Sequence, residues 1–140
     1  MIKRLTLAAS IIVMLLAISC NKKEEQPGMV GDWYISNITK TGCTTGGANG
    51  STDFGCDDTY CFMITLDADG AFGSSQTING TSQDDTGSYL IMGDTIEICT
   101  QGATSCANYE LAYERGADTF TTTTTDGSTG CVTVTTYTRK

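Results

Sequence analysis

Histidine is absent from this chain, proline and tryptophan occur once each, and basic residues are half as frequent as acidic ones. Without histidine the chain has no Ser-His-Asp or Cys-His catalytic arrangement and lacks the commonest ligand of transition metals. The formal net charge of −8 disfavours binding to nucleic-acid phosphates, which attract basic surfaces. We therefore expect a protein that is not an enzyme, binds no nucleic acid and needs neither a metal nor a cofactor.

Long apolar runs are also missing, except for residues 5–18, which follow Lys3 and Arg4. A membrane-spanning helix needs about 20 apolar residues, so this run is too short to span comfortably. A positively charged N-terminal segment followed by a short apolar core is typical of a secretion signal. We therefore expect the protein to be exported.

The apolar run ends at Ala17-Ile18-Ser19-Cys20, which resembles the lipobox of bacterial lipoproteins. The resemblance implies that residues 1–19 are a signal peptide and that Cys20 carries fatty acyl chains such as palmitate. The alternative is an ordinary signal peptide with Cys20 as a spare thiol. Fatty acyl chains would hold the protein to a membrane by burying their CH₂ groups.

Residues 20–27 are polar after the cysteine and are interpreted as an anchor and tether, with one domain at 28–140. Lys23-Glu24-Glu25 resembles a tag that directs some lipoproteins to the outer cell surface, although it also fits a solvated linker. We expect a lipid-anchored protein of the outer membrane, and these two interpretations differ on whether it faces the cell exterior.

The domain is rich in threonine and glycine and shows no helical periodicity, which indicates an all-β fold. Alternation of apolar and polar residues marks strands with one buried face, as in Tyr60–Leu66 and Ala107–Tyr113. Eight strands are predicted, at 30–40, 60–67, 70–78, 86–92, 94–100, 106–114, 118–125 and 131–139.

The predicted connections alternate in length along the chain. Those at 67–70, 93–94 and 115–118 are short, whereas 41–59 is long and 79–85, 100–105 and 126–130 are intermediate. Alternate connections of an up-and-down sheet lie at the same end, and closing eight strands into a barrel removes exposed edges. We expect an eight-stranded antiparallel barrel with tight turns at one end and longer loops at the other.

Several short sequence segments in the domain resemble segments of bacterial lipocalin-like proteins. They are Gly31-Asp32-Trp33, Ile64–Phe72 with its Asp-Ala-Asp-Gly turn, Gly87-Ser88-Tyr89, Gly93–Ile98 and the closing Thr136–Lys140. The resemblance implies an antiparallel barrel that holds a small apolar ligand. It also implies that Trp33 packs at the closed end near a late arginine, which would be Arg139 or, as the alternative, Arg115.

We therefore expect a lipocalin-like barrel that binds a small apolar or amphipathic ligand. The candidate ligand-binding side chains are apolar or aromatic residues of the strands: Trp33, Phe62, Ile64, Phe72, Tyr89, Ile96, Ile98, Tyr109 and Leu111. Such side chains also serve as core packing. The alternative function is a structural or interaction lipoprotein with a filled barrel and loops that bind a protein partner, which the sequence does not identify.

Six cysteines remain besides Cys20, and an even number in an exported chain indicates disulfides. In the predicted barrel all six lie at the end opposite the tight turns. Cys99 and Cys106 flank one loop and are expected to pair. The last strand should close against the first, which favours Cys43–Cys131 and leaves Cys56–Cys61, with Cys43–Cys61 and Cys56–Cys131 as the runner-up.

Acidic residues offer two further hypotheses. Asp67–Gly70 resembles the start of a calcium loop, but the twelfth position of an EF-hand loop is Ile78 here, so a β-turn is the preferred interpretation. The neighbouring acids Asp57-Asp58 and Asp84-Asp85 lie in polar stretches and are interpreted as solvated loop residues rather than as catalytic pairs.

Overall fold

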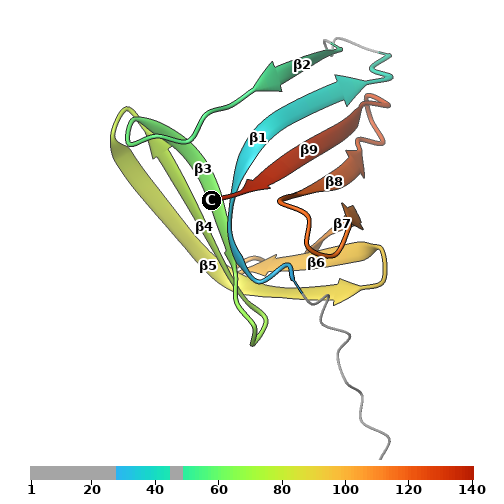
Figure 1. The fold of residues 1–140 in the computed structure, drawn as a ribbon. Coiled ribbons are helices and arrows are strands. Elements are labelled where there is room, and N and C mark those ends of the chain that lie inside the picture. Colours follow the sequence, from blue (N-terminus) through green and yellow to red (C-terminus); the bar gives the residue numbers. More distant parts are fainter. Residues whose placement is uncertain (1–27, 45–48) are drawn as a thin grey trace, which may run out of the picture.

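A computed structural model describes residues 28–44 and 49–140, which form a single antiparallel sheet closed on itself (Figure 1). The strands are β1 (Gly31–Thr41), β2 (Gly50–Asp53), β3 (Tyr60–Leu66), β4 (Ala71–Ile78), β5 (Thr81–Met92), β6 (Thr95–Thr100), β7 (Ala107–Tyr113), β8 (Thr119–Thr125) and β9 (Val132–Arg139). Pairing of β1 with β9 closes the ring, which contains every strand but β2. The predicted all-β, eight-stranded barrel is confirmed. None of the described residues forms a helix long and apolar enough to span a membrane.

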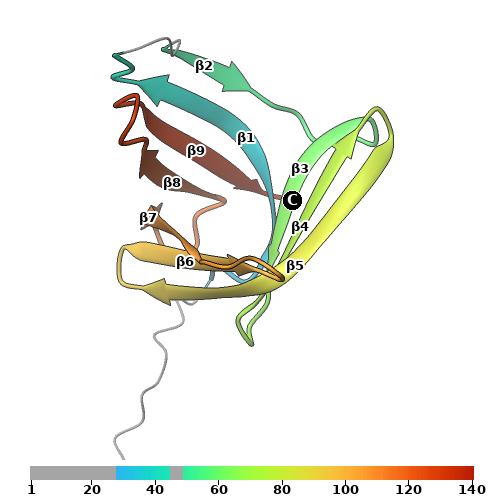
Figure 2. The ribbon, with the colours of Figure 1, turned by 180° about the vertical axis from the view of Figure 1, so that it is seen from behind.

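The ninth strand, β2, lies in the stretch that the sequence analysis treated as one long connection. It pairs with Asn37–Lys40 of β1, whereas β3 pairs with Gly31–Tyr34 of the same strand. The two strands thus occupy successive parts of one edge of β1, and β3 leaves that edge where β2 begins (Figure 2). Asn37 secures β2 by donating from Nδ2 to Ser51 Oγ at 2.8 Å and to Asp53 Oδ1 at 2.7 Å.

The prediction of an intermediate loop at 79–85 is wrong. Strand β5 begins at Thr81, because Asn79 and Gly80 form a two-residue turn with φ values of 52° and 75°. Two successive residues in the left-handed region are typical of the type I′ turn, which matches the twist of a hairpin. The hairpin of β4 and β5 therefore extends as an arm beyond the level at which β6 joins β5 at Gly87 (Figure 1).

The barrel has two different ends, which we call the floor and the mouth. The turns β3–β4, β5–β6 and β7–β8 lie at the floor, and the connections β1–β3, β4–β5, β6–β7 and β8–β9 lie at the mouth. This grouping follows the prediction, although the β4–β5 turn at the mouth is short. The chain enters β1 from the floor, so residue 28 and the mouth lie at opposite ends.

The hydrophobic core fills the floor end of the barrel. Its buried members, drawn from seven strands and the residues before β1, are Met29, Trp33, Leu66, Phe72, Ile91, Ile96, Leu111 and Phe120. The Trp33 ring meets Phe120 edge-on at a centroid distance of 4.8 Å, and Phe120 stacks on Tyr137 at 4.5 Å. Burial of large apolar side chains from nearly every strand makes this end the main source of hydrophobic stabilisation.

Arg139 joins the last strand to the residues that precede the first. Its guanidinium lies over the Trp33 ring at 4.1 Å from the centroid, which confirms the expected contact and favours Arg139 over Arg115. The same group donates to the carbonyl oxygens of Val30 at 3.2 Å and Gly28 at 2.5 Å, and Trp33 Nε1 donates to Met29 O at 2.8 Å. We call residues 28–30, held in this way, the floor clamp.

Candidate functional site

The inner wall of the barrel changes from apolar at the floor to polar at the mouth. The pairing register directs alternate residues inward, so β8 and β9 contribute Thr122, Thr124, Thr133 and Thr135 above Phe120 and Tyr137. On the other side of the barrel, β4 and β5 place Ser74 opposite Asp85 and Gln76 opposite Gln83 above Phe72. The open end therefore offers hydroxyl, amide and carboxylate groups above a packed apolar base.

A pocket of about 180 Å³ lies on the inner face of β3, β4 and β5, and we call it the mouth pocket. Ile35, Phe62 and Ile64 form its apolar side. Its polar side consists of Ser74, Gln76, Gln83 and Asp85, with Met63 and Ser75 completing the lining. Among these described lining residues none is basic, so the Asp85 carboxylate sets the sign of its charge.

Three aromatic rings stand beside the mouth pocket. Tyr60 and Phe62 meet edge-on with centroids 5.1 Å apart, and Phe54 lies 6.2 Å from each of them. Phe54 comes from the segment between β2 and β3, which is held to β1 because Phe54 N donates to Ser36 O at 2.8 Å. The three rings thus connect the segment held to β1 with β3.

A second pocket, of about 340 Å³, lies where β2 meets the outer part of β1, and we call it the β2 pocket. Ile38, Lys40 and Phe54 line it together with Asn49–Thr52. Phe54 thus belongs to the β2 pocket and contacts Phe62 of the mouth pocket. Sequence reasoning missed Phe54, Ile38 and Lys40, although Phe54 is the only aromatic residue between 41 and 59.

The candidate ligand-binding residues separate into two groups. Trp33, Phe72, Ile96 and Leu111 are buried in the floor core, against which Tyr89, Ile98 and Tyr109 pack. Phe62 and Ile64 line the mouth pocket, and Ile64 also touches the core. The Tyr89 hydroxyl donates to Asp67 O at 2.7 Å and so binds the β3–β4 turn. The structure therefore brings two of the nine residues together at a pocket of the mouth.

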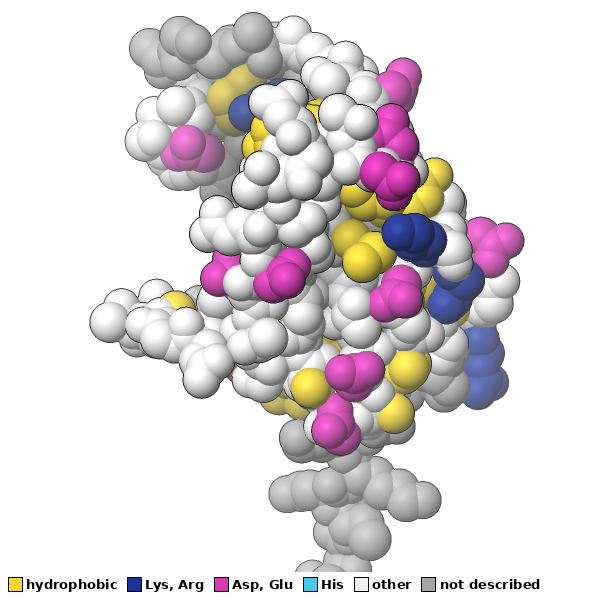
Figure 3. All heavy atoms as spheres, turned by 90° about the vertical axis from the view of Figure 1, so that its left-hand side faces the viewer, with side chains coloured by type: hydrophobic (Ala, Val, Ile, Leu, Met, Phe, Trp, Pro, Cys, Tyr) yellow, Lys and Arg dark blue, Asp and Glu magenta, His cyan; other side chains and the backbone are white. Residues whose placement is uncertain are grey.

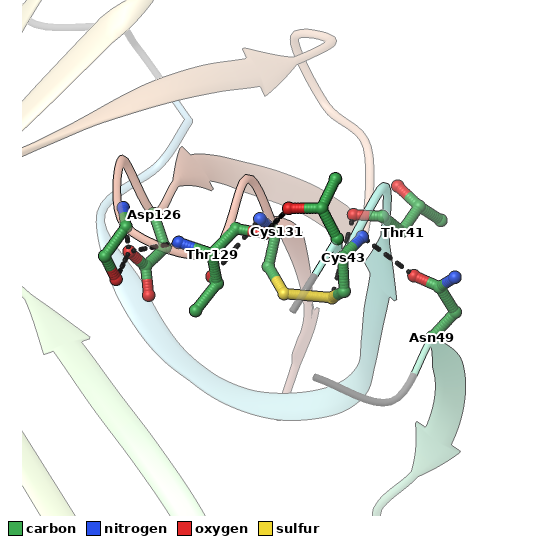
Figure 4. Close-up of a disulfide and its surroundings, with 8 residues drawn as sticks. Thr41, Cys43, Asn49, Asp126, Thr129 and Cys131 are labelled. Atoms are coloured by element: carbon green, nitrogen blue, oxygen red, sulfur yellow. Dashed lines mark hydrogen bonds between the residues drawn. A yellow bond between two sulfur atoms is a disulfide. The ribbon is translucent and has the colours of Figure 1, made fainter. Parts of the chain in front are cut away.

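Three disulfides brace the mouth. They join Cys43 to Cys131, Cys56 to Cys61 and Cys99 to Cys106, which are the pairs that the sequence analysis favours. Cys43–Cys131 ties the end of β1 to the start of β9 (Figure 4). Cys56–Cys61 joins the segment that follows Phe54 to β3, which carries Phe62. The walls of both pockets are therefore cross-linked close to their lining residues.

Hydrogen bonds reinforce the disulfide between β1 and β9. Asp126 Oδ1 accepts from Ser128 Oγ at 2.6 Å, Ser128 N at 2.8 Å and Thr129 N at 3.4 Å (Figure 4). The Ser128 hydroxyl and amide, followed by Thr129, lower the pKa of Asp126 from 3.8 to about 2. Thr129 O in turn accepts from Thr44 N at 3.0 Å, so this turn and the disulfide hold the same corner.

A second carboxylate orders the approach to β3. Asp57 Oδ1 accepts from the backbone N–H groups of Tyr60 and Thr59, each at 2.8 Å. Hydrogen bonds from Tyr60 and then Thr59 lower the pKa of Asp57. The predicted loop role of Asp57 therefore has a specific form, because this carboxylate fixes the turn from which Tyr60 and Phe62 extend.

The arrangement offers little to a metal ion. In the part of the chain that the structure describes, one acidic and cysteine group gathers ligand atoms within 4.8 Å of one another, and it consists of Glu97, Cys99 and Cys106. Both sulfurs are committed to a disulfide, so they supply no thiolate. The Asp67–Gly70 segment forms a tight turn, closed by a bond from Gly70 N to Asp67 O at 3.0 Å.

On the face formed by β3, β4 and β5, acidic side chains are scattered rather than gathered into one patch. Figure 3 shows this face, with basic side chains fewer than acidic ones and hydrophobic side chains between them. A hollow near the upper edge of this view exposes hydrophobic and basic side chains. The acidic side chains of this face would repel an anionic surface.

Comparison with known proteins supports the fold. No known family profile and no curated protein matches this sequence. Among solved structures, an uncharacterized protein from Bacteroides eggerthii DSM 20697 matches with a TM-score of 0.51 at 12% sequence identity. The match covers 79% of this chain and 98% of that chain. At this identity the likeness concerns the barrel architecture alone, and the chain is similar in fold to that protein.

Proposed function

We propose that this protein is a lipid-anchored lipoprotein of the cell envelope, with a lipocalin-like barrel that binds a small amphipathic ligand at its mouth. The mouth pocket is the observation that carries the proposal. It combines an apolar side formed by Ile35, Phe62 and Ile64 with polar groups on the neighbouring strands β4 and β5. Ligand pockets in proteins are mostly apolar with a few placed polar groups that fix orientation.

Packing of the floor core limits where a ligand can lie inside the barrel, and an open hollow of about 620 Å³ lined by Leu111, Tyr113 and Phe120 lies at its edge. Trp33, Leu66 and Ile96 are at most 1% exposed, so neighbouring side chains enclose them and a ligand cannot reach them. The mouth pocket volume of about 180 Å³ is also below the roughly 300–1,000 Å³ of drug-sized sites. The proposed ligand is therefore a small molecule, or one part of a larger one, held near the open end.

The anchor proposal rests on the sequence around Cys20, because residues 1–27 lie outside the described residues. Attachment at the floor clamp would direct the mouth away from the membrane, where a ligand or partner can reach it. The protein would act at the outer membrane by binding alone, without catalysis. Exposure at the cell surface is the further expectation from Lys23-Glu24-Glu25.

Replacement of the lipidation residue tests the anchor. Cys20→Ser should abolish fatty-acid incorporation and leave precursor or released protein, because no thiol remains at the acylation position. Metabolic labelling with radioactive palmitate measures this, and Cys99→Ser with Cys106→Ser provides a control that keeps Cys20. Label entering the Cys20→Ser chain would contradict the proposal.

Native mass spectrometry of protein purified from its own host tests ligand binding directly. We expect a retained small molecule that is lost in Phe62→Ala, because Phe62 forms part of the apolar wall. Met92→Ala is the matched control, since Met92 is 51% exposed and lies next to the β5–β6 turn at the floor. A host-purified protein that carries no small molecule, and binds none of the small molecules added to it, would contradict the proposal.

The filled floor also supports the alternative of a loop-mediated interaction protein. The segment from Thr100 to Cys106 is exposed throughout and is closed by the Cys99–Cys106 disulfide. A constrained, exposed loop presents a defined surface at low entropic cost. Under this alternative, replacing residues 101–105 with glycine and serine would abolish cross-linking to a partner on intact cells, and Phe62→Ala would leave it unchanged.

A further inference from the structure

The polar side of the mouth pocket is built from two cross-strand pairs. Ser74 on β4 lies opposite Asp85 on β5, and Gln76 lies opposite Gln83. Directly opposed residues on one face have Cβ atoms about 4.5–5.5 Å apart, so each pair presents neighbouring functional groups. All four side chains line the same pocket. The wall thus offers a short ladder of hydrogen-bonding groups on a regular hairpin.

This ladder mixes donors and acceptors. A glutamine amide has two donors and an acceptor oxygen, a serine hydroxyl both donates and accepts, and an ionised aspartate accepts at two oxygens. A ligand that satisfies the ladder needs adjacent groups that also donate and accept. Vicinal hydroxyl groups have this property, because each hydroxyl carries one donor and two acceptor positions.

Other classes of small ligand complement the hydrogen-bonding groups of this polar side less well. An alkyl chain would remove water from the two amides and from Asp85 without replacing their hydrogen bonds, which is costly. An anionic group would be repelled by Asp85. A simple cation would engage Asp85 alone and leave the amide groups without a partner from the ligand.

The apolar side of the pocket lies beside this ladder, because Phe62 pairs with Gln76 and Ile64 with Ser74, and it suits the flat face of a ring. Phe62 contacts both Tyr60 and Phe54, and Ile35 and Ile64 extend the apolar surface beside it. The face of an aromatic ring carries partial negative charge, which attracts the polarised C–H groups of a saturated ring. The pocket volume of about 180 Å³ equals the space of about six water molecules at ~30 Å³ each, enough for one ring and not for a long chain.

We propose that the mouth pocket binds a neutral, polyhydroxylated ring, that is, one saccharide unit. This inference rests on the proposed binding function and names its ligand class. The sugar hydroxyls engage Gln76, Gln83, Ser74 and Asp85, and the C–H face of the ring lies on Phe62. The disulfide Cys56–Cys61 keeps the aromatic wall in place while the β4–β5 hairpin supplies the polar wall.

Saturation-transfer NMR of the mature protein in phosphatidylcholine nanodiscs tests the ligand class. The probes are glucose, galactose, mannose and xylose, compared with dodecanoate and dodecylamine. We expect binding of at least one of the four sugars, with the strongest transfer to protons of one ring face. If an alkyl probe binds and every sugar fails, the saccharide proposal is overturned and the binding function stands. If no probe binds, both are overturned.

Substitution of Gln83 locates the site. Gln83→Ala should weaken sugar binding about threefold to tenfold, as expected for loss of one or two hydrogen bonds of ordinary net strength. Gln101→Ala is the matched control, because Gln101 is exposed outside the pocket and accepts from Thr86 Oγ1 at 2.9 Å. Both positions are exposed, so neither change threatens the core. Equal sugar affinity in the two variants would overturn the assignment to this pocket.

Discussion

At the scale of single residues, Trp33 is the largest buried side chain of the floor. It is fully buried, it meets Phe120 edge-on, and its ring carries the Arg139 guanidinium. Trp33→Ala should lower the free energy of unfolding by about 3–5 kcal/mol, because it leaves a large cavity. Denaturant unfolding measures this, with Trp33→Phe as the milder comparison. A loss under about 1 kcal/mol, the size of an average substitution, would contradict the buried placement.

Gly87 is required by the close approach of β5 to β6. A Cβ atom at this position would lie 2.1 Å from Cys99 O and 2.9 Å from Thr100 Cα, and both are backbone atoms. Gly87→Ala should destabilise the fold by about 1–3 kcal/mol, in the range of overpacked sites. Gly73→Ala is the control, since its Cβ would meet Thr65 Cβ at an ordinary 3.7 Å. Similar unfolding midpoints for the two variants would argue against this packing.

At the scale of elements, the β8–β9 turn should respond to acid through Asp126. Its pKa is lowered from 3.8 to about 2, so its contribution to stability is present above about pH 4. That contribution is lost as the pH falls through about 2, when the carboxylate protonates. NMR shifts of the Ser128 and Thr129 amides should follow this titration, and Asp126→Asn should remove it. A midpoint near pH 4 would show that these hydrogen bonds do not form.

Strands with one buried face were predictable because apolar and polar residues alternate along them. The structure has strands at Tyr60–Leu66 and Ala107–Tyr113, where every second side chain shares one face. From that face Ile64, Leu66, Tyr109, Leu111 and Tyr113 belong to the core or pack against it. Gly50–Asp53 and residues 81–85 are exposed on both faces, so they show no alternation and were missed as strands. The Asn79-Gly80 pair was a local signal for the hairpin, since this dipeptide favours a type I′ turn.

The mouth pocket could be predicted only in part. Phe62 and Ile64 stand out by their alternation, whereas Gln83 and Asp85 look like solvent-facing residues in the sequence. They line a pocket because the β4–β5 hairpin continues beyond β6 and curves with β3 toward Ile35. Barrel topology, in contrast, was sufficient to favour Cys43–Cys131, because closing the ring places the start of the last strand beside the end of the first.

At the scale of the whole molecule, the three disulfides should contribute unequally. Cys43–Cys131 spans 88 residues and Cys99–Cys106 spans 7. Loop-closure entropy predicts that the first stabilises the fold by about 4.6 kcal/mol and the second by about 2.4 kcal/mol. Unfolding of the paired Cys→Ser variants in denaturant should show this order. Equal losses would mean that the long disulfide does not restrict the unfolded chain as expected.

The floor clamp determines how the molecule would carry a mechanical load. A pull on the chain before residue 28 meets Arg139, whose guanidinium holds the Gly28 and Val30 carbonyls, and then passes into β1. That strand is paired with β9 from Trp33 to Thr41, so the force acts along the strands and shears many hydrogen bonds together. Because forced unfolding follows the barrier to unfolding, the barrel should resist traction from its attachment side better than its size suggests. Under the anchoring that we propose through Cys20, a load from flow or from a bound ligand would reach the barrel from this side and leave it folded.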